Sequence, residues 1–347
     1  MSLPTSDKEW ILKQQPEGQI SIADLPETFE LKDVALAPPG EASVLVKLLT
    51  LSNDPAQRTW IRKGGERKKL YVKPLVPGDT IHTIGIAKVI ATGKSAKMFK
   101  VGDLVYGWLH WAEYTVCKED DVFALDAYLG TLGFSGFTAY TGLHRVLKFQ
   151  TGQTLVVSGA AGSVGTVVVQ NAKKVLQAGK VVAIAGSKEK CDWLLSIGAD
   201  VALNYKSPNF KVDVAEAAPE GANKFSYLHP LFADISCQIF RQHSWANTRP
   251  CMKNHGRIAA CGAVVAYNST GAQTFENFFD IVSQRINLKG FICTDWMDMW
   301  PQFQVDITKA IQDGKVMLGE GTDTVVDLRG KFEDIPKVWL RLSEGGN

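Results

Sequence analysis

A run of apolar residues followed by closely spaced glycines, from Thr154 to Lys180, constrains the fold more than any other stretch of the chain. The run is TLVVSGAAGSVGTVVVQNAKKVLQAGK. Its start predicts a buried strand, and Val164, Val168 and Ala172 recur at the spacing of one helix face. A strand, a glycine turn and a helix in this order are typical of a dinucleotide-binding βαβ unit. We therefore predict an α/β fold with a doubly wound parallel sheet.

The glycines of this turn suit a bound pyrophosphate. Glycine lets the backbone turn tightly, lets a phosphate approach the amides and lets the helix pack close to the sheet. The amino end of the next helix presents unpaired N–H groups and the positive end of its dipole. The residues expected to bind are Gly159, Gly162, Ser163, Val164 and Gly165. The alternative is a glycine turn with a structural role only.

The end of the next predicted strand indicates which dinucleotide binds. An NAD site places Asp or Glu there, about 20 residues after the glycines, to bind the ribose hydroxyls. In KVVAIAGSKEK, Gly186 holds that place and is followed by Ser187, Lys188 and Lys190. A small residue with a hydroxyl and ammonium groups suits a 2′-phosphate, so we predict NADP(H). The alternative is a pair of solvated lysines at the start of a helix.

The rest of the chain separates into segments of different character. From Glu9 to about Asp126, short β-branched runs alternate with glycine and proline, which predicts an irregular, mostly-β unit. From Gly130 to about Ile292, apolar strand-like runs alternate with helical patterns, as in a parallel sheet. From about Pro301 we expect a helix, a short strand and a second helix. A length of 347 residues suits two domains.

Composition excludes several classes of function. The net charge of +2 gives no general field for nucleic acid or an anionic membrane, so the aromatic and basic stretch QIFRQHSWANTRP (238–250) does not predict a nucleic-acid site. We expect no chemistry from His243 and Trp245. No apolar run reaches the ~20 residues of a membrane span and no signal peptide pattern begins the chain, so we expect a cytoplasmic protein. The six cysteines contain no C-x-x-C pair and are interpreted as reduced, mostly buried thiols.

Ordered motifs extend over nearly the whole chain. They are LSNDPAQR (51–58), GIAKVIATG (85–93), FKVGDLVYGWLHWAEYTV (99–116), LGFSGFTAYTGL (132–143), VVSGAAGSVG (156–165), AGSKEKCDWL (185–194), NYK (204–206) and HGRIAACGAVVAYN (255–268). On these motifs the chain resembles the zinc-independent medium-chain dehydrogenases/reductases, in the subfamily of leukotriene B4 dehydrogenase/prostaglandin reductase, alkenal double-bond reductase and curcumin reductase. The resemblance implies a GroES-like, mostly-β catalytic domain (1–125 and a truncated return, 301–347) around a Rossmann NADP-binding domain (126–300). It also implies a homodimer formed through the Rossmann domain.

Zinc alcohol dehydrogenases share this architecture but have features that the chain lacks. They carry an early catalytic cysteine, a G-H-E run and a four-cysteine lobe, whereas the first cysteine here is Cys117. Without clustered ligands at metal spacing we predict no zinc site. We interpret His82 and His110 as structural histidines.

The resemblance implies an NADPH-dependent reductase of the C=C bond of enals and enones, with a small unsaturated carbonyl compound as substrate. Such a reaction needs a hydride, a donor for the charge on the carbonyl oxygen and a proton for the α-carbon. Tyr267 matches the family tyrosine that serves the oxyanion and proton delivery; its alternative is a tyrosine that only covers the cofactor. Tyr71 matches a tyrosine lining the substrate cleft, or serves packing only. Further positions matched to the cofactor are Thr138, Tyr205, Cys261, Gly262 and Asn347.

One substitution leaves other functions open. Ala56 stands where the family pattern D-P-Y-M-R has tyrosine, so an aromatic wall of the substrate pocket is missing. The alternatives are an NADPH-binding protein with little catalysis, such as a sensor or decayed paralogue, and a quinone reductase of the same superfamily.

Two segments depart from the family pattern. After residue 221 the family has a strand of the form Y-F-D-N-V-G-G, whereas this chain has ANKFSYLHPLFADISCQIFRQHSWANTRP. A sheet without that strand would leave buried ladder groups unpaired, at about 1–3 kcal/mol each. Among the synonymous codons that could encode residues 239–250, there are choices whose shifted frame, read from each second base, spells a close match to the absent strand. We hypothesise a retained intron or frame error from about Lys224 to Arg249; the alternative is a divergent insertion. The family's closing G-K-x-V strand is also absent after Asn347, which we interpret as truncation.

Overall fold

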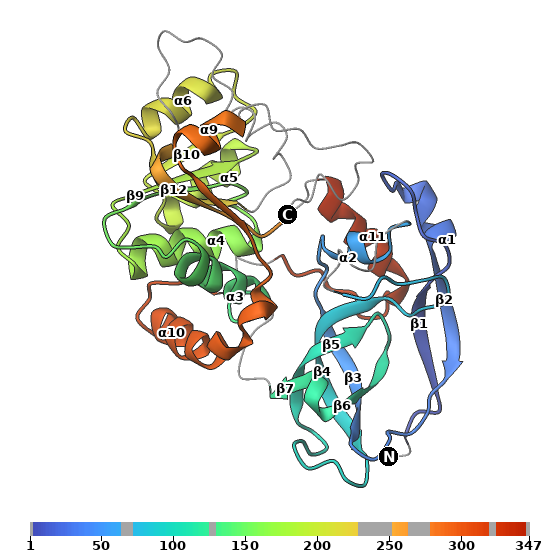
Figure 1. The fold of residues 1–347 in the computed structure, drawn as a ribbon. Helices are drawn as coiled ribbons and strands as arrows, with labels where there is room; N and C mark the ends of the chain where they lie inside the picture. Colours follow the sequence, from blue (N-terminus) through green and yellow to red (C-terminus); the bar gives the residue numbers. More distant parts are fainter. Residues whose placement is uncertain are drawn as a thin grey trace. The chain divides into compact units, whose positions relative to one another are not determined.

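The computed structural model describes residues 3–63, 72–124, 130–227, 252–262, 278–318 and 324–344, and the chain divides into two compact units (Figure 1). Among the described residues, unit 1 holds 3–63, 72–124 and 325–344. Unit 2 holds 130–227, 252–262, 278–318 and 324. Within these ranges no helix is both long and apolar enough to cross a membrane.

Unit 2 is built on six parallel strands. They are β8 (Thr154–Val157), β9 (Lys180–Ala185), β10 (Val201–Asn204), β11 (Ala222–Tyr227), β12 (Met252–Ala260) and β13 (Asn287–Gly290). Their order is β10-β9-β8-β11-β12-β13, and each neighbouring pair is parallel. Every residue from Val181 to Ala185 is buried, so both faces of β9 are covered. The predicted doubly wound parallel sheet is confirmed.

Strand β11 occupies the centre of this sheet and corrects the expectation that the central strand is missing. It pairs with β8 from Lys224↔Leu155 to Ser226↔Val157, and with β12 from Lys224↔Arg257 to Tyr227↔Ala260. The backbone of Ala222–Tyr227 therefore satisfies the ladder groups of both neighbours. This strand includes the first residues of the segment that we attributed to a frame error. Residues 228–251 lie outside the described ranges, and the origin of the segment stays a hypothesis.

Helices follow the strands of unit 2 in the alternation that the sequence predicts. They are α3 (Phe134–Thr141) with the π-helical turn η4 (Gly142–Val146), α4 (Ser163–Gln170) with η5 (Asn171–Val175), α5 (Lys188–Ile197), α6 (Phe210–Ala217), α9 (Phe278–Ser283), η7 (Cys293–Met299) and α10 (Trp300–Gln312). α4 packs against β8 and α3, and α5 packs against β9 and β10.

The structure places residues 301–318 in unit 2, whereas the sequence interpretation assigned them to the returning catalytic segment. The ring of Phe303 in α10 lies 5.4 Å from that of Phe137 in α3. The Tyr140 hydroxyl also donates a hydrogen bond to Asp306 Oδ2 at 2.6 Å. These buried contacts join α10 to unit 2, and the return to unit 1 begins after it.

Unit 1 contains a five-stranded antiparallel sheet and a separate two-stranded pair. The sheet is formed by β3 (Ser43–Leu51), β4 (His82–Thr92), β5 (Leu104–His110), β6 (Tyr114–Lys118) and β7 (Val122–Ala124), in the order β6-β3-β4-β5-β7. β1 (Ser6–Leu12) pairs with β2 (Phe29–Ala35). Alternate residues such as Val44, Val46, Ala87, Val89 and Val105 form the core of the sheet. The GroES-like, mostly-β unit is confirmed.

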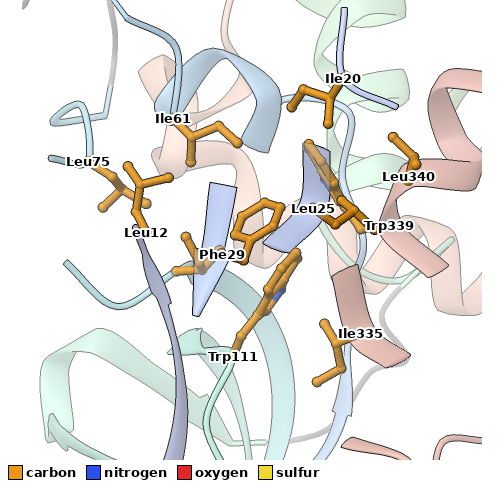
Figure 2. Close-up of a cluster of buried hydrophobic side chains, with 11 residues drawn as sticks. Leu12, Ile20, Leu25, Phe29, Ile61, Leu75, Trp111, Ile335, Trp339 and Leu340 are labelled. Carbon is orange, nitrogen blue, oxygen red and sulfur yellow. The ribbon is translucent and has the colours of Figure 1, made fainter. Parts of the chain in front are cut away.

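A second core of unit 1 joins the two ends of the chain (Figure 2). Trp339 comes from α11 (Ile335–Leu340), and its ring lies 5.7 Å from that of Phe29 and 6.2 Å from that of Trp111. Ile335 and Leu340 are buried in the same cluster, with Leu25 of α1 (Leu25–Thr28) and Ile61, which directly follows α2 (Gln57–Trp60). Short 3-10 turns complete the unit: η1 (Ile22–Asp24), η3 (Glu119–Asp121), η8 (Phe332–Asp334) and η9 (Arg341–Glu344).

Candidate cofactor-binding site

The glycine turn predicted from the sequence joins β8 to α4 in unit 2. Gly159 has a φ of +58°, a conformation that glycine adopts without strain. The Ala160 N–H donates to the Ile184 carbonyl of β9 at 3.0 Å, which fixes the turn to the sheet. The Gly162 N–H then donates to the Gly159 carbonyl at 3.0 Å, and Gly162 is the N-cap of α4. The turn therefore places the amino end of α4 beyond the carboxyl end of β8.

Gly165 and Gly162 have different steric surroundings. A Cβ on Gly165 would lie 2.6 Å from the Ala160 carbonyl oxygen and even closer to that of Gly159, so only glycine allows α4 to pack against the turn. A Cβ on Gly162 would meet only the Gly159 carbonyl oxygen, at an ordinary 3.4 Å. Among the described residues, space is therefore left beside Gly162, where a ligand is able to approach the backbone.

The first residues of α4 present polar groups at this end of the helix. Ser163 is exposed and Val164 is partly exposed, and helix geometry leaves the first N–H groups without intrahelical acceptors. The Ser163 hydroxyl lies 3.3 Å from the Ser135 hydroxyl near the start of α3. This arrangement fits a diphosphate, because N–H groups, hydroxyls and the helix dipole all favour an anion.

Beyond the end of β9, the Tyr205 ring lies against Gly186. A Cβ on Gly186 would be 2.9 Å from both Cε1 and the hydroxyl oxygen of Tyr205, so the missing side chain creates the space for this ring. The Tyr205 N–H donates to the Ala185 carbonyl at 3.0 Å, which holds the two segments together. Burial raises the pKa of the Tyr205 hydroxyl, so it stays a hydrogen-bond donor at neutral pH. Neither position supplies the carboxylate expected of an NAD site.

The residues after Gly186 begin α5. The Ser187 hydroxyl caps the helix by accepting a hydrogen bond from the Lys190 N–H at 3.3 Å. Lys188 forms an ion pair with Asp192 at 2.6 Å along the exposed helix surface. Lys190 is partly buried, and Lys206 Nζ lies 5.8 Å from the centre of the Tyr205 ring. Sequence reasoning missed Lys206, although the NYK motif contains it directly after the matched tyrosine.

A third group of predicted residues gathers beside α3. The Thr138 hydroxyl donates to the Phe134 carbonyl at 2.8 Å and also interacts with the Cys293 thiol at the start of η7. Burial raises the pKa of Cys293, against the effect of the Thr138 hydroxyl. Burial likewise raises the pKa of Cys261, and the neighbouring Cys293 adds to the shift. Thr138, Cys261 and Cys293 therefore lie near one another, and Gly262 follows directly in the chain. No sequence motif points to Cys293 as a residue of this group.

The remaining predicted residues lie outside the described ranges. They are Tyr71, Tyr267 and Asn347, so their roles stay predictions. The described part of the chain contains no group of three or more His, Cys, Asp or Glu side chains placed to hold a metal ion. Of the described cysteines, Cys117, Cys191 and Cys293 are buried, and Cys261 is partly exposed.

Comparison with known proteins shows the family to which the chain belongs. Two family models match the chain, "N-terminal domain of oxidoreductase" over residues 8–125 and "Zinc-binding dehydrogenase" over residues 163–313. A 2-alkenal reductase (NADP(+)-dependent) of Nicotiana tabacum is 32% identical over 360 residues, with 100% of this chain and 97% of the relative aligned. Prostaglandin reductase 1 of Oryctolagus cuniculus is 32% identical over 353 residues, with 98% of this chain and 91% of the relative aligned.

A solved structure shares the fold along the same length. CurA of Vibrio vulnificus in complex with NADPH superposes with a TM-score of 0.82 at 24% sequence identity, and the match covers 98% of this chain and 96% of that chain. The motifs, the two-unit fold and relatives above 30% identity over nearly the full length agree. The chain therefore belongs to the medium-chain dehydrogenase/reductase family, in the subfamily of the 2-alkenal and prostaglandin reductases.

Proposed function

We propose that the chain is an NADPH-dependent reductase that transfers hydride to the C=C bond of α,β-unsaturated aldehydes or ketones. The activities for which its relatives are named, 2-alkenal reductase and prostaglandin reductase, support the reaction class. The observation that carries the choice of cofactor is the Tyr205 ring packed on Gly186, where an NAD enzyme would have a carboxylate. A negative charge there would repel the 2′-phosphate.

The residues of unit 2 fit three parts of NADP(H). Gly159, Gly162, Ser163, Val164 and Gly165 would hold the pyrophosphate through backbone N–H groups and the α4 dipole. Gly186, Ser187, Lys190 and Tyr205 would hold the 2′-phosphate end, with hydroxyls and an ammonium as donors. Thr138, Cys261, Gly262 and Asn347 would surround the nicotinamide end. Bound NADPH supplies the hydride, and the chain supplies position and polarisation.

The catalytic roles of the two tyrosines are part of the proposal. Tyr267 would donate a hydrogen bond to the carbonyl oxygen as charge develops on it and would pass a proton toward the α-carbon. Tyr71 would line the substrate cleft. Ala56 lies beside α2, where the family pattern has a tyrosine, so we expect a roomier substrate pocket than in relatives with D-P-Y-M-R.

The experiment is NADPH oxidation by the full-length protein with 2-alkenals, enones and quinones in parallel. We expect turnover of enals and enones, with NADPH strongly preferred over NADH. Tyr267→Phe should lower kcat by about 10²–10³-fold, as the loss of an oxyanion donor does elsewhere. Its NADPH affinity, measured by fluorescence titration, should be unchanged. NADPH binding without turnover of any compound would instead identify a sensor or decayed paralogue, and turnover of quinones alone would identify a quinone reductase.

We also propose a homodimer formed through unit 2, in the cytoplasm. Strand β13 is the last strand of the described sheet, and its residues are exposed. Nearby in sequence, the apolar side chains of Phe279 and Val282 in α9 are 74% and 57% exposed. An edge strand beside exposed apolar residues favours pairing with a second chain. Light scattering of the wild type and Leu288→Asp tests this, because the substitution should yield monomers.

A further inference from the structure

Two histidines in unit 1 face one another across neighbouring strands of the main sheet. His82 in β4 is the register partner of His110 in β5. The Trp111 N–H donates to the Ile81 carbonyl at 2.8 Å, so the His82–His110 pair falls between two hydrogen-bonded positions of the ladder. Side chains approach each other most closely at such positions. The two imidazole rings are stacked, with centroids 5.2 Å apart and an interplanar angle of 25°.

The separation of the rings matches that of two imidazoles on one metal ion. A Zn–N distance of about 2.0–2.1 Å, plus about 1.1 Å from the nitrogen to the ring centre, places each centroid about 3.2 Å from the metal. Two such rings at a right angle have centroids about 4.5 Å apart, and at the tetrahedral angle about 5.2 Å apart. The observed 5.2 Å fits the tetrahedral arrangement, which rotation of the rings about their Cβ–Cγ bonds would complete.

The surroundings favour neutral imidazoles that still reach solvent. Thr83 and Leu109, the neighbouring register partners, are 1% exposed on the core face, whereas both histidines lie on the other face and are partly exposed. Burial lowers the pKa of His110 to about 4, and the neighbouring His82 contributes. Burial also lowers the pKa of His82, while the charge of Asp79 opposes this and that of Lys73 adds to it. Neutral imidazole is the form that binds a metal ion.

We propose that His82 and His110 form a chelating site for a divalent transition-metal ion, with Zn²⁺ as the ion that fits the geometry. Water completes the tetrahedral coordination, because the described residues offer no third protein ligand. Both histidines come from unit 1, and the proposal does not rest on the proposed reductase activity. The competing interpretation is a stacked pair of rings that binds nothing.

The test is Zn²⁺ binding to the full-length, EDTA-treated protein by titration calorimetry. We expect the protein to bind one Zn²⁺ ion per chain at neutral pH. His82→Gln and His110→Gln should each weaken Zn²⁺ binding by at least about tenfold. Removing a residue that only hydrogen-bonds a metal ligand already lowers metal affinity by about 10–100-fold, and here a ligand itself is removed. Binding should weaken as the pH falls, because protons compete for the imidazoles. His255→Gln, at an exposed histidine of unit 2, is the matched control and should bind as the wild type does.

Co²⁺ gives a second measurement that needs no variant. Intense visible absorption would report tetrahedral coordination, and paramagnetic broadening should affect two of the six histidines in imidazole NMR spectra. Circular dichroism of each metal-free variant separates misfolding from the loss of a ligand. The proposal is overturned if the wild type binds no Zn²⁺, if both glutamine variants bind as tightly as the wild type, or if broadening spares His82 and His110.

Discussion

Asp7 makes the stability of unit 1 depend on pH near neutrality. The residue lies in β1 and is 1% exposed. Its Oδ1 accepts a hydrogen bond from the Tyr114 N–H at 3.1 Å, and its Oδ2 has no hydrogen-bond partner within the described ranges. Burial raises the pKa of Asp7 to about 7; the Tyr114 N–H opposes this shift and the charge of Glu9 adds to it. The folded protein therefore favours the protonated acid.

The free energy of unfolding should fall as the pH rises. In the unfolded chain the carboxyl ionises near its usual pKa of 3.8, so below about pH 4 both states hold the proton and the stabilisation is complete. Above that pH the unfolded chain loses the proton first, and the stability declines until the folded acid also ionises near pH 7. A difference of about 3 pKa units corresponds to about 4 kcal/mol, of which about 2.5 kcal/mol is lost between about pH 5 and pH 8.

Asp7→Asn tests this, because the amide keeps an acceptor for Tyr114 and cannot ionise. Urea unfolding of both proteins between pH 5 and pH 8 should show the wild type losing about 2.5 kcal/mol relative to the variant. Asp33→Asn, at an exposed position of β2, is the control and should follow the wild type. If the difference between wild type and Asp7→Asn is the same at every pH, the carboxyl does not titrate in this range and the reasoning is refuted.

Other substitutions test the cofactor site and the core of unit 1. Gly165→Ala forces a methyl group against the backbone of the glycine turn, so we expect a loss of about 1–3 kcal/mol in urea unfolding and weaker NADPH binding. Gly162→Ala meets only an ordinary contact and should lose NADPH affinity without losing stability; equal stability loss in both variants would contradict this. Gly186→Asp brings a Cβ to 2.9 Å from the Tyr205 ring and adds a charge that repels the 2′-phosphate, so the Kd for NADPH in fluorescence titrations should rise about tenfold or more, and that for NADH less. Trp339→Ala should cost about 3–5 kcal/mol, and a loss below about 1 kcal/mol would show that α11 does not support the core.

The local part of the cofactor site could be predicted from the sequence, and the non-local part could not. The residues of the glycine turn lie within seven positions of each other, so strand, turn and helix patterns were sufficient to place them. The contact between Gly186 and Tyr205 spans 19 positions and depends on the pairing of β9 with β10. Composition alone does not predict such a contact, although the resemblance to the family indicates that Tyr205 binds the cofactor.

The errors of the sequence interpretation also concern long-range packing. The family pattern suggested a missing central strand because its side chains differ, whereas parallel pairing uses backbone groups that ANKFSY also supplies. Helix α10 was assigned to the wrong unit because its amphipathic pattern shows a buried face but not the partner, which is α3 with Phe137. Cys293 was missed since nothing in its local sequence indicates proximity to Thr138.

The position of α11 has a consequence for synthesis of the protein in the cell. Ile335, Trp339 and Leu340 complete a core whose other residues include Leu12 and Phe29. During translation the first strands therefore emerge long before the helix that buries their apolar surface, and all of unit 2 is synthesised in between. Unit 2 is able to fold on the ribosome while the amino-terminal part still exposes aromatic side chains. We expect chaperones to bind mainly to this amino-terminal part and to dissociate when α11 leaves the ribosomal tunnel.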